Sequence, residues 1–133
     1  MATTQTVQAV NLVKGPHYDG DLYAFEVAVL VDGTYLTNGF TFDVLAAIQA
    51  QYQGVSAVGV KAVSLWQDYN DGTNRYTSSN ADITLSGTGN KTVTAELWTG
   101  CTDGDSSGSE VSNLTAVHGT ISFLVLTTLT PRL

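Results

Sequence analysis

Apolar and polar side chains alternate most clearly over residues 21–31, DLYAFEVAVLV. Tyr23, Phe25 and the valines at every second position after them fall on one face of a strand, because successive side chains point to opposite faces. This pattern predicts a strand whose aromatic and β-branched face lies in the core.

Two dipeptides after this strand are typical of tight turns between antiparallel strands. Asp32-Gly33 predicts a hairpin, with TYLT as the returning strand. Asn38-Gly39 predicts a second turn before the short strand FTF.

Alternation of period two recurs elsewhere in the chain, over residues 5–14, 55–69, 81–86, 91–98 and 115–131. A change of phase near Ala62 indicates either a β-bulge or a strand buried on both faces. The GTGN sequence between 81–86 and 91–98 predicts a hairpin. The last segment is the most apolar and is expected to be a central strand that Pro131 ends.

One segment has helical spacing instead, with apolar residues at Val44, Leu45, Ile48 and Tyr52. Asp43 can cap its first turn, and Gly54 can end it in a left-handed conformation. The pattern therefore predicts one α-helix over about residues 44–53, which must pack on the sheet to be stable.

Many short strands with tight turns predict a mainly β fold, an antiparallel β-sandwich or barrel with one short α-helix. The length of 133 residues favours one β-rich domain over 1–133. Residues 1–10 are expected to form an extended arm or an edge strand.

Composition narrows the function classes. Charged residues make up 13% of the chain, against about 25% in average domains. The formal net charge is −7, and the five Lys and Arg residues are scattered. Because phosphate binding needs clustered basic residues, nucleic acid and anionic membranes are not expected as partners.

The cysteine count and the N-terminal sequence bear on the cellular compartment in which the protein is made. One cysteine excludes a disulfide within the chain, and MATTQTVQAV lacks the basic and apolar regions of a signal peptide. No apolar run reaches the roughly 18 residues of a membrane helix. We therefore expect synthesis in the cytoplasm and no membrane partner.

The segment TGCTDGDSSGSEVSN, residues 99–113, is rich in acids. Asp103, Asp105 and Ser107 match the start of a calcium-binding loop, D-x-D-x-S-G. The twelfth position of that template needs a bidentate acid and holds Leu114, while Glu110 comes too early. The three residues are therefore only weak candidates for Ca²⁺ ligands, and the pattern favours a solvated turn.

Catalytic chemistry has little support. Cys101 has acidic neighbours, which disfavour a reactive thiolate, and His118 lies in a polar strand face. The HYDGD segment, residues 17–21, offers alternating His and Asp residues but is more typical of a turn. Phosphate loops and common hydrolase motifs are absent from the sequence, so we expect no enzyme, no catalytic residue and no cofactor.

Aromatic residues near polar turns are the candidates for ligand or interface contacts. Aromatic rings beside amide and carboxylate groups are typical of sugar-binding modules and of protein interfaces, although such rings also fill cores. The candidates are Trp66, Tyr69, Arg75, Tyr76 and Trp98.

The whole chain resembles small β-rich virion proteins of tailed bacteriophages, of the capsid decoration (cement) type. The resemblance lies in the lead-in ATTQTVQAVNL, the acidic surface rich in Thr, Ser, Gly and Asn, and the final strand GTISFLVLTTLTPRL. It implies a structural protein of the virion, often trimeric, that bridges shell subunits. Its expected partners are the major capsid protein or another virion protein.

Two alternatives stay open from the sequence. One is a carbohydrate- or receptor-binding β-module of a phage tail, which predicts exposed tryptophans in a concave site. The other is a metal-dependent or thiol enzyme, which predicts clustering of Cys101 with a histidine or a cation at Asp103 and Asp105.

Overall fold

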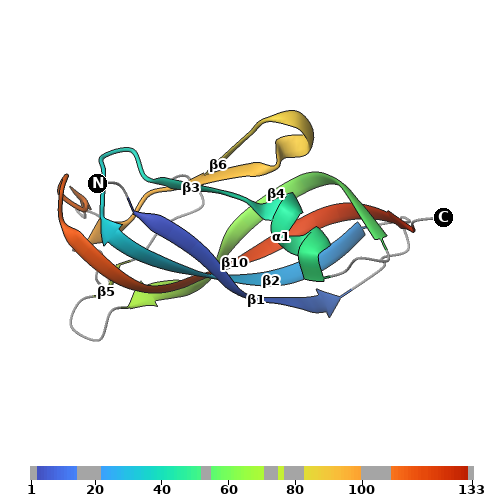
Figure 1. Cartoon of the computed structure of the whole chain (residues 1–133), viewed down its shortest axis with the longest axis horizontal. Coiled ribbons are helices and arrows are strands. Elements are labelled where there is room, and N and C mark those ends of the chain that lie inside the picture. Colours follow the sequence, from blue (N-terminus) through green and yellow to red (C-terminus); the bar gives the residue numbers. More distant parts are fainter. Residues whose placement is uncertain are drawn as a thin grey trace.

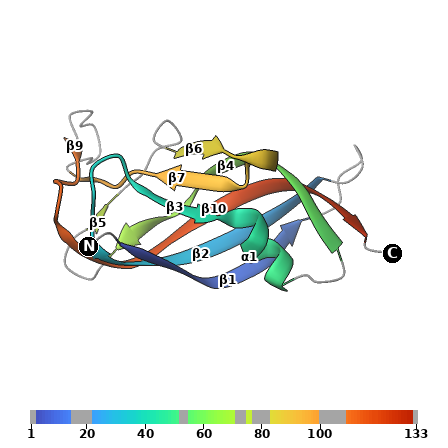
Figure 2. The ribbon, with the colours of Figure 1, turned by 45° about the horizontal axis from the view of Figure 1, so that its top comes forward.

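The fold consists of antiparallel strands in two packed sheets, with a small third sheet at one end (Figures 1 and 2). The computed structural model describes residues 3–14, 22–51, 55–70, 75–76, 83–99 and 109–131. The larger sheet has the strand order β1 (Thr4–Lys14), β2 (Leu22–Thr34), β10 (Ala116–Pro131), β4 (Val55–Asn70) and β5 (Arg75–Tyr76). The second sheet contains β3 (Phe40–Asp43), β7 (Thr92–Ala95) and β6 (Ile83–Ser86), and the third pairs β8 (Trp98–Thr99) with β9 (Ser109–Glu110). The predicted mainly β, antiparallel fold is confirmed in a sandwich-like form, and the sheets do not close into a barrel.

The alternating strand β2 places its aromatic and β-branched face in the core, as predicted. Phe25, Val27, Val29 and Val31 are at most 1% exposed. Burying each such side chain contributes roughly 1.5–3 kcal/mol relative to leaving it in water. These residues provide the apolar floor on which the second sheet packs.

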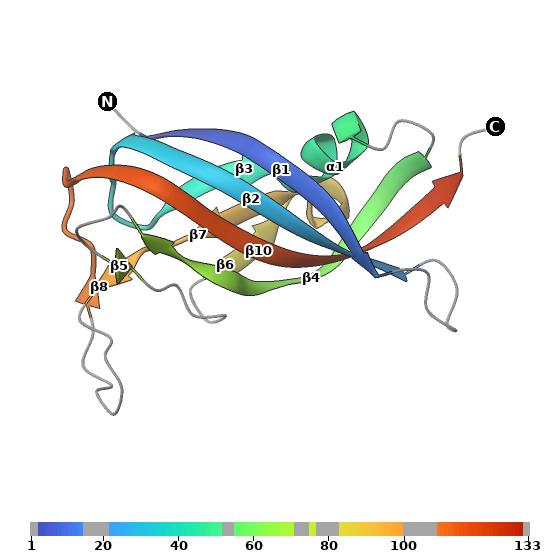
Figure 3. The same cartoon turned by 90° about the horizontal axis from the view of Figure 1, so that it is seen from below.

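The central strand is β10, as its apolar sequence predicts. It pairs with β2 on one side and with β4 on the other (Figure 3). Phe123 of β10 contacts Phe42 of β3, with ring centroids 5.5 Å apart. This aromatic contact joins the two sheets across the core.

The single α-helix is α1 (Val44–Gln51), and it begins where the sequence predicts. Asp43 Oδ1 accepts a 2.9 Å hydrogen bond from Ala46 N, which confirms the predicted cap. Val44, Leu45 and Ile48 are buried, so the apolar stripe faces the core. The predicted continuation through Tyr52 to Gly54 lies outside the described residues.

The predicted hairpin at Asp32-Gly33 is wrong. β2 continues through this dipeptide to Thr34, because β10 supplies a partner residue opposite each position up to Ala116. The ladder of hydrogen bonds therefore overrides the local turn preference. The chain turns instead at Asn38 and Gly39, whose φ angles are +81° and +100°, as the second dipeptide predicts.

The phase change near Ala62 is a β-bulge. The register of β4 against β10 shifts between Ala62 and Val60. Thr127 lies opposite the shift, is fully buried, and donates a 2.7 Å hydrogen bond to the carbonyl oxygen of Gly59. This bond gives the buried hydroxyl a backbone acceptor beside the bulge.

Strand β1 forms one edge of the larger sheet and pairs with β2 from Thr4 opposite Asp32 to Lys14 opposite Ala24. Residues 4–10 thus belong to an edge strand that pairs within its own chain. In the described part of the chain, no helix is long and apolar enough to cross a membrane.

Candidate functional site

Several sequence candidates fall outside the described residues. They are the calcium-loop residues Asp103, Asp105 and Ser107, the thiol of Cys101, and the HYDGD segment 17–21. The side chains of Arg75 and Tyr76 are likewise not described, although their backbones form β5. Over the ranges that are described, no three His, Cys, Asp or Glu side chains lie close enough to hold a metal ion.

The three described aromatic candidates occupy different environments. Trp66 in β4 is 49% exposed, whereas Tyr69 in the same strand is completely buried. Trp98 in β8 is partly buried, and its Nε1 is shielded from solvent without a hydrogen-bond partner among the described residues. Of these three, only Trp66 is exposed, and about half of its side chain is open to a ligand or partner.

A buried tyrosine organises the end of the molecule where β8 and β9 lie. The hydroxyl of Tyr35 donates a 2.7 Å hydrogen bond to Glu110 Oε2 and accepts a 3.1 Å bond from Leu97 N. The same Glu110 oxygen accepts a 2.8 Å bond from Asn38 N. Burial first, and then the bond to Glu110, raise the pKa of Tyr35 well above its usual range, so the phenol stays a donor.

Two loops meet at this end and are tied by backbone groups. Tyr35 N donates to Thr115 O at 2.8 Å, and Leu114 N donates to Tyr35 O at 2.7 Å. Thr37 N donates to Asn113 Oδ1 at 3.1 Å. The loops 35–39 and 111–115 therefore form one rigid unit.

This unit exposes two leucines, which we call the leucine end: Leu36, 38% exposed, and Leu114, 65% exposed. Leu114 has a φ of +68°, in the left-handed region that leucine rarely adopts. From the sequence, Leu114 stands out only as a residue that does not fit the calcium-loop template. A leucine within the turn sequence SNLT was the available signal, because turns normally carry polar residues.

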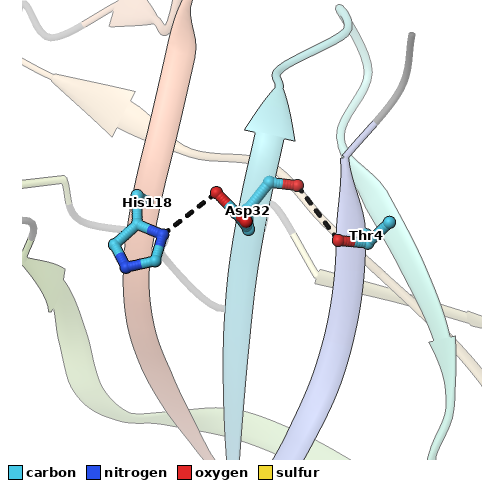
Figure 4. A network of polar contacts seen from close by, with 3 residues as sticks. All are labelled: Thr4, Asp32 and His118. Carbon is cyan, nitrogen blue, oxygen red and sulfur yellow. Dashed lines mark hydrogen bonds and ion pairs between the residues drawn. The ribbon is translucent and has the colours of Figure 1, made fainter.

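The outer face of the larger sheet carries rows of side chains that bond from strand to strand. Figure 4 shows the row formed by Thr4, Asp32 and His118. His118 Nδ1 lies 3.0 Å from Asp32 Oδ1, and Thr4 Oγ1 donates to the backbone oxygen of Asp32 at 3.3 Å. His118 thus lies on the polar face, as expected, and contacts a carboxylate.

Two further pairs extend this network along the same face. Thr120 Oγ1 donates a 2.8 Å bond to Gln8 Oε1, which reaches from β1 across β2 to β10. Asn11 Nδ2 donates to Glu26 Oε1 at 3.3 Å. Both carboxylates on the described part of β2 are therefore matched by a polar side chain from an adjacent strand.

Comparison of the chain with models of protein families, with curated proteins and with solved structures finds no significant match. Arguments about function therefore rest on the surfaces described above.

Proposed function

We propose that the chain is a structural protein of a virion, a capsid decoration protein that binds assembled shell subunits as a homo-oligomer, with a trimer as the favoured form. In this proposal its partner is the major capsid protein or another virion protein. The protein acts by permanent contact rather than by turnover, and it stabilises the shell because it binds the assembled form.

The observation that carries the proposal is the outer face of β1, β2 and β10. The register places small and uncharged side chains there, in rows with the bonded groups. These include Thr6, Ala28, Leu30, Thr120 and Leu124. Charged residues are depleted at interface cores because their desolvation is costly, so such a face suits a broad protein contact.

Rigidity supports the same role. The strands of this face pair antiparallel along their length, with two register shifts in β1, and their side chains bond across strands through Gln8, Asn11 and His118. Groups that are already ordered lose little conformational entropy when a partner binds. A preorganised surface therefore favours lasting attachment.

Co-sedimentation with intact capsids and with unassembled capsid subunits tests the proposal. We expect binding to capsids and none to free subunits. Thr6→Arg places a bulky charge on the outer face and should weaken binding at least about ten-fold, a loss typical of a central contact. Thr84→Arg is the matched control, since Thr84 is also an exposed strand threonine but lies in β6 of the other sheet. Failure of the unmodified protein to bind capsids, or equal losses for both variants, would count against the role.

Trp66 favours a second candidate function, a carbohydrate- or receptor-binding module of a phage tail. Its ring is half exposed, and aromatic faces bind sugar rings. This function predicts a change in tryptophan fluorescence on addition of glycans that Trp66→Ala abolishes. A fluorescence response that persists in Trp66→Ala, or no response in the unmodified protein, argues against it.

A further inference from the structure

The leucine end has properties that the fold itself does not require. Leu114 is 65% exposed, so its side chain contributes little to the core. Its backbone lies in the left-handed region, where Asn or Gly meets less steric resistance than leucine. A large apolar side chain in an unfavourable conformation at the surface points to a contact outside the fold.

The leucine end is also held in one conformation. Leu114 N bonds to the carbonyl of Tyr35, the residue beside Leu36, and Asn113 bonds to Thr37. Below them, the buried Tyr35 hydroxyl joins Glu110 and Leu97. An apolar surface that is already ordered before binding, such as the leucine end, loses little conformational entropy on association.

A shallow open recess lies beside the leucine end. It lies between the start of β1 and β3, and its lining residues are Thr3, Gln5, Leu36, Gly39, Phe40 and Thr41. None of them carries a charge, and Leu36 belongs both to the recess and to the leucine end. The surface therefore offers a protruding leucine and a neutral, partly apolar recess next to each other.

Charge favours this surface for a contact between copies of the chain. Two copies of a chain with a formal charge of −7 repel each other wherever their carboxylates meet. The recess and the two leucines contain no ionisable side chain, and the nearby Glu110 carboxylate is already bonded to Tyr35 and Asn38. This surface thus lets two like-charged copies approach without opposing bare charges.

We infer that the leucine end is the contact between copies of this chain, with Leu114 of one copy covering the recess beside Leu36 of the next. The inference rests on the homo-oligomer part of the proposed function and names the surface that would form it. It is independent of which capsid protein the oligomer binds.

Sedimentation equilibrium of the unmodified chain and of Leu114→Asn tests the contact. We expect the unmodified chain to form a defined oligomer and Leu114→Asn to weaken self-association at least about ten-fold. Asparagine adopts the left-handed conformation readily, so Leu114→Asn should keep the β-sheet circular dichroism spectrum. Loss of association then reflects the lost side chain and not misfolding.

Leu12→Asn is the matched control, because Leu12 is 47% exposed on β1 near the opposite end of that strand. It should associate like the unmodified chain. A second variant, Thr41→Asp, places a carboxylate in the recess and should shift the equilibrium toward the monomer. A monomeric unmodified chain over roughly 1–500 µM, or an oligomer that Leu114→Asn and Thr41→Asp leave intact, overturns the inference.

The capsid co-sedimentation above separates the two proposals. Capsid binding by a monomeric chain overturns the contact and leaves the decoration role standing. An oligomer that depends on Leu114 but ignores capsids supports the contact and removes the decoration role.

Discussion

The hydroxyl of Tyr35 donates a 2.7 Å hydrogen bond to Oε2 of Glu110, a residue that lies 75 positions later in the chain. The same oxygen of Tyr35 accepts a bond from Leu97 N. One fully buried phenol thus joins the loop after β2, the segment before β8 and the strand β9. The exposed leucines of the leucine end stand on this buried junction.

Replacing Tyr35 by phenylalanine should destabilise the fold by about 2 kcal/mol, because the buried Leu97 N–H loses its acceptor and Glu110 loses a donor. Urea unfolding followed by fluorescence measures the change as a lower midpoint with an unchanged slope. Tyr23→Phe is the control, since Tyr23 is only partly buried and its hydroxyl bonds to no described residue. An unchanged midpoint for Tyr35→Phe would show that the bond adds no net stability.

The same tyrosine makes stability depend on alkaline pH. Burial and the bond to Glu110 raise the pKa of Tyr35 above its ordinary value of 10.0. Above pH 10 the unfolded chain releases this proton while the folded chain keeps it, so stability is complete below pH 10 and falls as pH rises. By pH 11 the free energy of unfolding should be lower by about 1.4 kcal/mol because of this group. Unfolding free energies at pH 9 and pH 11 should therefore differ less in Tyr35→Phe, and parallel pH profiles for the two proteins contradict the assignment.

The cap of α1 offers an independent test of local structure. Asp43→Ala removes the acceptor for Ala46 N and should cost about 1 kcal/mol. Asp43→Asn keeps an oxygen acceptor and should cost less. Thermal unfolding measured for both variants checks the order, and equal losses would indicate that the carboxylate acts through its charge alone.

The features that the sequence predicts correctly depend on neighbouring residues. The buried face of β2 follows from strict alternation, and the start of α1 follows from Asp43 and the apolar positions after it. The bulge near Ala62 is visible as a change of phase. Each is a local pattern with a period of two or of about four, which is why it can be read without the partner strand.

The features that the sequence does not predict depend on residues that are distant in the chain. Asp32-Gly33 fails to turn because β10, more than eighty residues later, pairs with it. The bond between Tyr35 and Glu110 has no local signal, since neither residue belongs to a motif. The burial of Tyr69 and the exposure of Trp66 likewise follow from the packing of β4 in the sheet, because either ring could have filled the core.

Two glycines in the left-handed region provide the last prediction, because they differ in what surrounds them. Gly39 has a φ of +100°, and a Cβ added there would overlap the carbonyl oxygen of Ala95 and lie 2.8 Å from its carbon. Gly87 has a φ of +82°, but its nearest atom would be Thr92 Oγ1 at 3.3 Å, in a side chain that can move.

Gly87→Ala should therefore cost only the backbone strain, about 1 kcal/mol. Gly39→Ala carries the same strain and must also push the turn away from β7, whose backbone cannot yield without breaking the β3–β7 ladder. Its cost should exceed that of Gly87→Ala by at least about 2 kcal/mol, in the range of overpacking a rigid site. Urea unfolding of both variants measures the difference. Equal losses would mean that the turn at Asn38 and Gly39 can shift freely against the second sheet, which would contradict a rigid support for the leucine end.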